Sequence, residues 1–100
     1  MKIIQTKKYA ETAALGIKED AKSSDKIMLR QAIIAEYDAT SLYEQMAESA
    51  TSEKVKKIML DISREEKIHI GEFEALLDEI DSEHEESVQE GKKEVKEKIK

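Results

Sequence analysis

Hydrophobic positions recur at steps of three and four residues in two separate segments of the chain, the spacing that places side chains on one face of an α-helix. The first stripe predicts a helix from about Asp25 to Ala50, and the second predicts a helix from about Ser52 to Ile80. The first stripe consists of Leu29, Ala32, Ile33, Ala39, Tyr43, Met46, Ala47 and Ala50. The second consists of Val55, Ile58, Met59, Ile62, Glu66, His69, Ile70, Phe73, Leu76, Leu77 and Ile80.

Polar residues stand where these helices are expected to begin and end. Asp25, or a serine just before it, is expected to cap the first helix by accepting from its free N–H groups. The stretch 49–52 supplies a loop and a new cap for the second helix. Because so short a loop makes the two helices antiparallel neighbours, residues 25–80 are predicted to form a helical hairpin.

The two ends of the chain are less regular. Residues 1–24 show little periodicity and are interpreted as a partly ordered leader. Residues 81–100 are strongly charged, although Val88, Val95 and Ile99 keep a weak helical spacing. This C-terminal segment is therefore predicted to be a short charged helix or a linker.

The composition fits an all-α chain that needs a partner. Charged residues make up 40% of the chain and aromatic residues 4%, and proline and tryptophan are absent, which favours long helices. The hydrophobic residues, 39% of the chain, lie in stripes that supply little closed core. We expect the hairpin to dimerise and thereby complete a four-helix bundle.

Charge and cysteine content narrow the functional classes. The formal net charge of −6 and the lack of a basic face argue against nucleic-acid binding. Without cysteine, any metal must be held by oxygen and imidazole ligands. The sequence contains no membrane-spanning run and its start lacks the apolar core of a signal peptide, so we expect no membrane partner and a cytoplasmic location.

Three ionisable residues interrupt the middle of the apolar stripes. Glu66 and His69 are three positions apart, so they share a helix face and can bind the same metal. Glu36 holds the equivalent place in the first helix. Taken singly, the glutamates could be solvated edge residues and the histidine a hydrogen-bonded interface residue. Their joint placement is costly unless something pairs with the buried charge.

A two-fold copy would complete a metal site from these residues. Di-iron sites in ferritin-like bundles take a glutamate from each of two helices and a Glu-x-x-His pair from each of two others. One hairpin supplies half of that set, and two-fold symmetry supplies the other half. Tyr43, two turns after Glu36 on the same face, is a candidate hydrogen-bond partner of a ligand, although a core tyrosine fits its position equally well.

Residues 32–77 resemble the encapsulated ferritin-like proteins, relatives of ferritin and rubrerythrin with half of the four-helix bundle. The likeness is carried by AIIAEYDATSLYEQMA and VKKIMLDISREEKIHIGEFEALL, with the Glu36, Tyr43, Glu66 and His69 pattern. The resemblance implies a di-iron ferroxidase centre between two subunits, dimers in a ring, typically a decamer, and residence inside an encapsulin shell. It implies that Glu36, Glu66 and His69 are ligands of two irons per dimer interface, with Tyr43 beside them. It also suggests secondary metal contacts for Asp38, Asp61 and Glu65.

Three functions compete at this point. The first is a ferroxidase that oxidises Fe(II) to Fe(III) for iron storage in an encapsulin compartment. The second is a rubrerythrin-like di-iron peroxidase, although rubrerythrins often carry a cysteine-bound iron, which this sequence cannot provide. The third is a metal-free helical interaction module. The C-terminal KKEVKEKIK differs from the apolar targeting peptide of encapsulin cargo, so a fused cargo–capsid chain also remains open.

Overall fold

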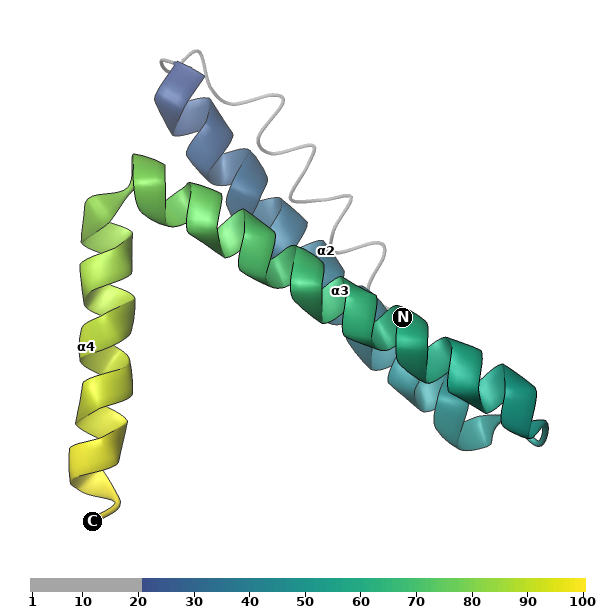
Figure 1. The fold of residues 1–100 in the computed structure, drawn as a ribbon. Coiled ribbons are helices and arrows are strands. Elements are labelled where there is room, and N and C mark those ends of the chain that lie inside the picture. Colours follow the sequence, from purple (N-terminus) through teal and green to yellow (C-terminus); the bar gives the residue numbers. More distant parts are fainter. Residues whose placement is uncertain (1–20) are drawn as a thin grey trace.

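The computed structural model describes residues 21–100 of the 100-residue chain. Within that range the chain forms the helices α2 (Ala21–Ser49), α3 (Glu53–Ile80) and α4 (Ser82–Lys98), and no strand. Figure 1 shows α2 and α3 side by side as an antiparallel hairpin, which confirms the all-α prediction. No helix in this part of the chain combines the length and the apolar character that crossing a bilayer requires.

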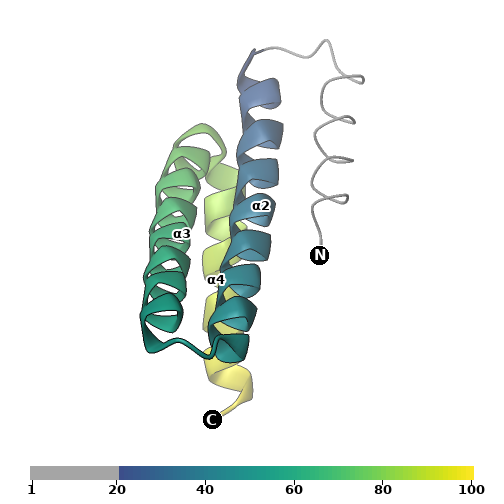
Figure 2. The same ribbon diagram turned by 90° about the vertical axis from the view of Figure 1, so that its right-hand side faces the viewer.

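The loop of the hairpin has the predicted chemistry. Residues 50–52 join the two helices, and the Ser52 hydroxyl accepts a hydrogen bond from the Val55 backbone N–H at 3.3 Å. This contact satisfies one of the free N–H groups in the first turn of α3. The tight connection is visible in Figure 2 at the end of the hairpin opposite α4's attachment.

The start of α2 differs from the prediction. The helix begins at Ala21, so Asp25 lies inside it and the expectation that Asp25 or a neighbouring serine caps it is wrong. No glycine or proline stands between Ala21 and Asp25, so nothing in this stretch prevents the helix from starting earlier than Asp25. The predicted leader, 1–24, falls mostly outside the described residues, and its last four positions belong to α2.

The buried core of the hairpin is narrow. Apart from Ile70 and Leu77, its buried side chains are small: Ala47, Thr40 and Ser63. Small residues allow the two backbones to approach closely, and the buried Thr40 hydroxyl is satisfied by the Glu36 carbonyl oxygen at 2.8 Å. Two packed helices bury only the side chains along their line of contact. The hairpin therefore leaves much of each apolar stripe exposed.

Exposed apolar side chains of the hairpin form an apolar outer face, defined by Met28 and Met46 on α2 and Val55, Ile58 and Leu76 on α3. These side chains are between 43% and 57% exposed. At one end of this face lies an open groove of about 350 Å³. The groove is lined by Asp25, Met28, Leu29, Ala32, Phe73, Leu76, Glu79 and Ile80. Several half-exposed apolar side chains on one face are typical of a contact surface, in line with the expectation that the hairpin needs a partner.

Helix α4 leaves the end of α3 and runs away from the hairpin. The two overlap in the view of Figure 2, but Figure 1 shows that they are well separated. None of its residues is buried, and Val88, Val95 and Ile99 are 40%, 55% and 76% exposed. The C-terminal segment is thus a continuous helix rather than a linker.

Asp81 holds the junction of the three helices together. Its Oδ1 atom accepts from the His84 backbone N–H at 3.1 Å and caps α4. Its Oδ2 atom accepts from Arg30 Nη2 at 3.0 Å and lies 4.0 Å from Lys26 Nζ, both on α2. The hydrogen bond from His84, helped by the two cations, lowers the pKa of the Asp81 carboxyl below its ordinary value. Asp81 therefore links the start of α2 to the end of α3 and the beginning of α4.

The charge of Asp81 should make a pH-dependent contribution to stability. Because its pKa is lower in the folded chain, the contribution is present above the unfolded pKa of about 4 and is lost as pH falls through the folded value. We expect Asp81→Asn, which keeps a capping oxygen, to melt a few degrees below the parent at neutral pH, with the difference closing in acid. Circular dichroism melts measure this, with Glu90→Gln on exposed α4 as the control. A difference that is independent of pH would contradict the role of the charge.

Candidate metal centre

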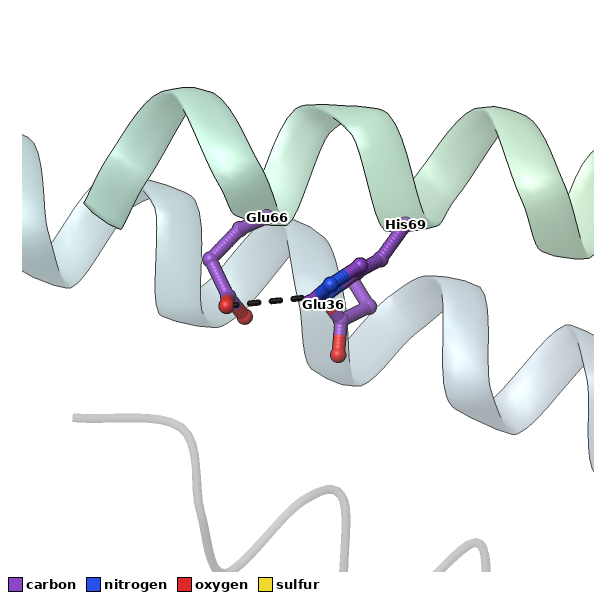
Figure 3. A group of neighbouring side chains, drawn as sticks. All are labelled: Glu36, Glu66 and His69. Atoms are coloured by element: carbon purple, nitrogen blue, oxygen red, sulfur yellow. Dashed lines mark hydrogen bonds and ion pairs between the residues drawn. The ribbon is translucent and has the colours of Figure 1, made fainter. Parts of the chain in front are cut away.

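Glu36, Glu66 and His69 meet between the two helices of the hairpin. Glu66 and His69 project from neighbouring turns of α3, because residues three apart share a helix face. Glu36 comes from the middle of α2, which the antiparallel connection sets opposite the middle of α3. Figure 3 shows the three side chains converging on one small volume. The structure thus brings together all three residues that the sequence predicts as ligands.

The distances within the cluster suit a shared cation. His69 Nδ1 lies 3.0 Å from Glu36 Oε2 and 3.6 Å from Glu66 Oε1. One ligand atom from each residue falls within 4.8 Å of the others. Two atoms that bind the same ion at about 2.1 Å lie within about 4 Å of each other, so the two contacts to His69 already have the right span. Carboxylate and imidazole donors suit iron, manganese or zinc.

The cluster is sheltered on the hairpin side and open on the other. The side chains of Glu36 and Glu66 are 20% and 17% exposed, whereas His69 is 45% exposed. Two carboxylates and one imidazole cannot fill the coordination shells of two metal ions. The open side is where further ligands would have to approach.

The electrostatics of the cluster favour extra positive charge. The pKa of Glu66 is raised, first by burial and then by its hydrogen bond with Glu36 and the charge of that residue. The pKa of His69 is also raised, chiefly because it donates a hydrogen bond to Glu36. Because both pKa values are raised, the cluster binds protons more readily, and these protons offset part of the negative charge of the two carboxylates. A bound cation would offset the same charge.

Neutralising Glu66 should relieve the metal-free fold. Because its folded pKa is raised, the ionised carboxylate disfavours the folded state, and this effect appears as pH rises through the folded pKa. We expect Glu66→Gln to melt a few degrees above the parent in chelator at neutral pH. This gain in melting temperature should shrink near pH 4, which is roughly the unfolded pKa of glutamate. The exposed Glu74 on the same helix provides the control, Glu74→Gln. A Glu66→Gln protein that melts below the parent at neutral pH would contradict the repulsion between the carboxylates.

The other predicted site residues lie outside the cluster. Tyr43 is half-buried and follows Glu36 by two turns, about 10 Å along α2, and it makes no hydrogen bond to the three residues in the described structure. Asp38 is two positions from Glu36 and so lies on the opposite side of α2. Asp61 and Glu65 are exposed on α3. The structure does not bring these four residues together with Glu36, Glu66 and His69.

Sequence reasoning missed a polar contact beside the cluster. Glu44 Oε2 accepts from the Ser63 hydroxyl at 3.3 Å and lies 3.0 Å from Lys67 Nζ. A weak signal for it existed, since Ser63 and Lys67 are four residues apart and flank Glu66. The partner on α2 follows only from the alignment of the two helices.

Comparison with known proteins identifies the family. The family model described as Rubrerythrin matches residues 28–100. The chain belongs to the rubrerythrin family. The described helices and the carboxylate–histidine cluster agree with a ferritin-like protein of this kind, and an iron-related function is supported.

Two similar proteins come from Pyrococcus furiosus. A ferritin-like-encapsulin shell fusion protein is 56% identical over 70 residues, which are 70% of this chain and 20% of that protein. The chain thus spans a fifth of the length of this curated relative. The crystal structure of an encapsulated ferritin domain is 49% identical, with a TM-score of 0.76, and the match covers 83% of this chain and 85% of that one. These matches confirm the resemblance to encapsulated ferritin-like proteins.

Proposed function

We propose that two copies of this chain pair to form a di-iron centre that oxidises Fe(II) to Fe(III). The observation that carries the proposal is the convergence of Glu36, Glu66 and His69 within 4.8 Å at the open side of the hairpin. Membership of the rubrerythrin family and the likeness to an encapsulated ferritin domain support it.

Pairing is supported by what one hairpin lacks. A single chain offers two carboxylates and one imidazole, and a two-fold copy doubles the set to four carboxylates and two imidazoles, as ferritin-like di-iron sites require. Four ionised carboxylates and two ferrous ions sum to zero charge. The apolar outer face flanks the cluster and would be covered by the same contact.

Each residue has a definite task in the proposed reaction. Ferrous iron is the substrate, and Glu36 and Glu66 bind it through anionic oxygens that also favour the higher charge of the ferric product. His69 binds through the lone pair of Nδ1 after that nitrogen loses its proton. Each ferrous ion gives up one electron, and dioxygen accepts the electrons together with protons from solvent. The apolar outer face of the partner would limit access of water to the centre.

Loss of a ligand should slow iron oxidation. We expect the parent protein to oxidise ferrous iron in air faster than buffer alone, as measured by the absorbance of ferric iron and by oxygen consumption. Glu36→Ala and His69→Ala should fall to nearly the buffer rate, because each removes two ligands from a two-fold site. Glu48→Ala, exposed on the same helix as Glu36, should retain the parent rate.

The alternatives give different outcomes in the same assay. Oxidation that is faster with hydrogen peroxide than with dioxygen would favour the rubrerythrin-like peroxidase, for which the family match is the supporting observation. Ligand variants that oxidise iron as fast as the parent would refute a catalytic centre at this cluster. A parent protein that binds no metal at all would favour the helical interaction module.

The larger assembly and its location are also proposals. We infer that dimers join into a ring, in which the exposed stripe on α4 offers a further contact between chains. The relatives' names speak of an encapsulin shell fusion and an encapsulated domain, which supports an encapsulin compartment in the cytoplasm as the location of this chain. Iron storage would then belong to the shell, since the open hairpin of α2 and α3 does not enclose a mineral-sized space.

Metal should control dimerisation. Because the complete site exists only in the pair, bound ions favour the dimer by mass action, by about 2.7 kcal/mol when free metal is a hundred times its dissociation constant. We expect ferrous iron, added without oxygen, to raise the dimer fraction in sedimentation velocity and chelator to lower it. Glu66→Ala should remove this response, and Glu74→Ala, at an exposed position of the same helix, should keep it. A parent assembly that is indifferent to metal would contradict an intersubunit site.

A further inference from the structure

The geometry of the cluster depends on how α2 and α3 are aligned along their common axis. Glu36 lies on one helix, and Glu66 and His69 lie on the other. A shift by one residue moves a side chain by about 1.5 Å along an α-helix and by about 100° around it. The 3.0 Å contact between Glu36 and His69 cannot survive such a shift. Some contact near the cluster must therefore fix the alignment.

On the loop side of the cluster the fully buried side chains are small, and the larger apolar residues are only half-buried: Leu42, Tyr43, Met59 and Ile62. The buried residues there are Thr40, Ala47 and Ser63, and the larger buried residues Ile70 and Leu77 lie toward the other end of the hairpin. Hydrophobic attraction is not directional, and small side chains present shallow ridges to a neighbouring helix. These residues bring the helices close together, but they leave the axial position to other contacts.

The contact of Glu44 with α3 is directional and sits at the right level. The buried Ser63 hydroxyl and the Lys67 ammonium both reach Glu44 Oε2, at 3.3 Å and 3.0 Å. Since Ser63 and Lys67 are four residues apart on one face of α3, a single oxygen on α2 is held by two successive turns. The pKa of Glu44 is lowered, chiefly by the hydrogen bond from Lys67, so the carboxylate stays ionised.

The same two turns carry a predicted ligand. Ser63 precedes Glu66 by three positions, and Lys67 follows Glu66 directly. The Glu44 and Lys67 side chains are 47% and 59% exposed, and exposed ion pairs add little to global stability. The effect of this contact should therefore appear in the geometry of the cluster more than in the melting temperature.

We propose that Glu44, Ser63 and Lys67 are positioning residues, which align α2 and α3 so that Glu36 meets Glu66 and His69. The proposal rests on the proposed metal-binding function, because the alignment matters only if the three residues share ions. None of the three positioning residues touches the metal itself. Their role is to hold the turn of α3 that bears Glu66 at a fixed height on α2.

Cobalt(II) is a suitable probe, because its visible absorption reports ligand geometry without any turnover. We expect Glu44→Ala to weaken cobalt binding about tenfold, similar to the lower end of the range for residues that orient metal ligands, and to alter the absorption bands. Glu44→Gln keeps an oxygen that accepts from Ser63 and Lys67, so it should lie between Ala and the parent. Glu48→Ala, one turn further along α2, is the matched control and should bind as the parent does.

A charge exchange separates positioning from charge alone. The double variant Glu44→Lys with Lys67→Glu restores an ion pair between the same positions, and we expect it to recover most of the cobalt affinity that either single change loses. Melting temperature and sedimentation velocity, recorded on every variant, show whether folding and pairing are intact. If Glu44→Ala does not fold, Glu44→Gln and the exchange pair still decide the question.

The possible failures are distinct. A parent protein that does not bind cobalt would overturn the proposed metal function and the positioning role with it. A parent that binds cobalt, together with Glu44→Ala of unchanged affinity and spectrum, would overturn the positioning role alone. An affinity loss shared equally by Glu48→Ala would also overturn it, since the cause would then be net charge.

Discussion

The closeness of two carboxylates and an imidazole between α2 and α3 constrains the rest of the structure. Burial and mutual repulsion raise the pKa of Glu66, and the same charges raise the pKa of His69. Burying such ionisable side chains between two apolar helix stripes costs free energy, so they weaken the contact between the helices unless their charges are paired. The cation that we propose for this cluster would take the place of the protons and offset the repulsion between the two carboxylates.

The sequence allows the hairpin and this cluster to be predicted, because both follow from helix periodicity. The spacing of Glu66 and His69 and the matching place of Glu36 need only the period of 3.6 and a short loop. Ser52 was recognisable as a cap for the same local reason. The beginning of α2 was not, since the residues around Asp25 contain no signal that forces a helix to start there rather than at Ala21.

Outside the cluster, contacts between residues far apart in the chain could not be predicted. Asp81 resembles an ordinary cap in the sequence, but its second oxygen pairs with Arg30, 51 positions away. Glu44 and Ser63 look like solvent-facing polar residues until the helices are aligned, whereupon Ser63 becomes buried. Periodicity and a short loop place the two helices only approximately along their common axis, so the individual partners of Glu44 and Asp81 do not follow from them. Tyr43 is a further example. The period places it on the same face as Glu36, but it lies two turns from the cluster, so a shared face did not lead to a contact.

The two directional contacts lie on either side of the cluster along the hairpin. Glu44 meets Ser63 and Lys67 toward the loop, and Asp81 meets Arg30 toward α4. Both contacts lie within one chain, so the alignment that they support would precede the pairing that we propose. In the pairing that we propose, two half-sites already formed within each chain would come together, so part of the cost of ordering the site would be met before association.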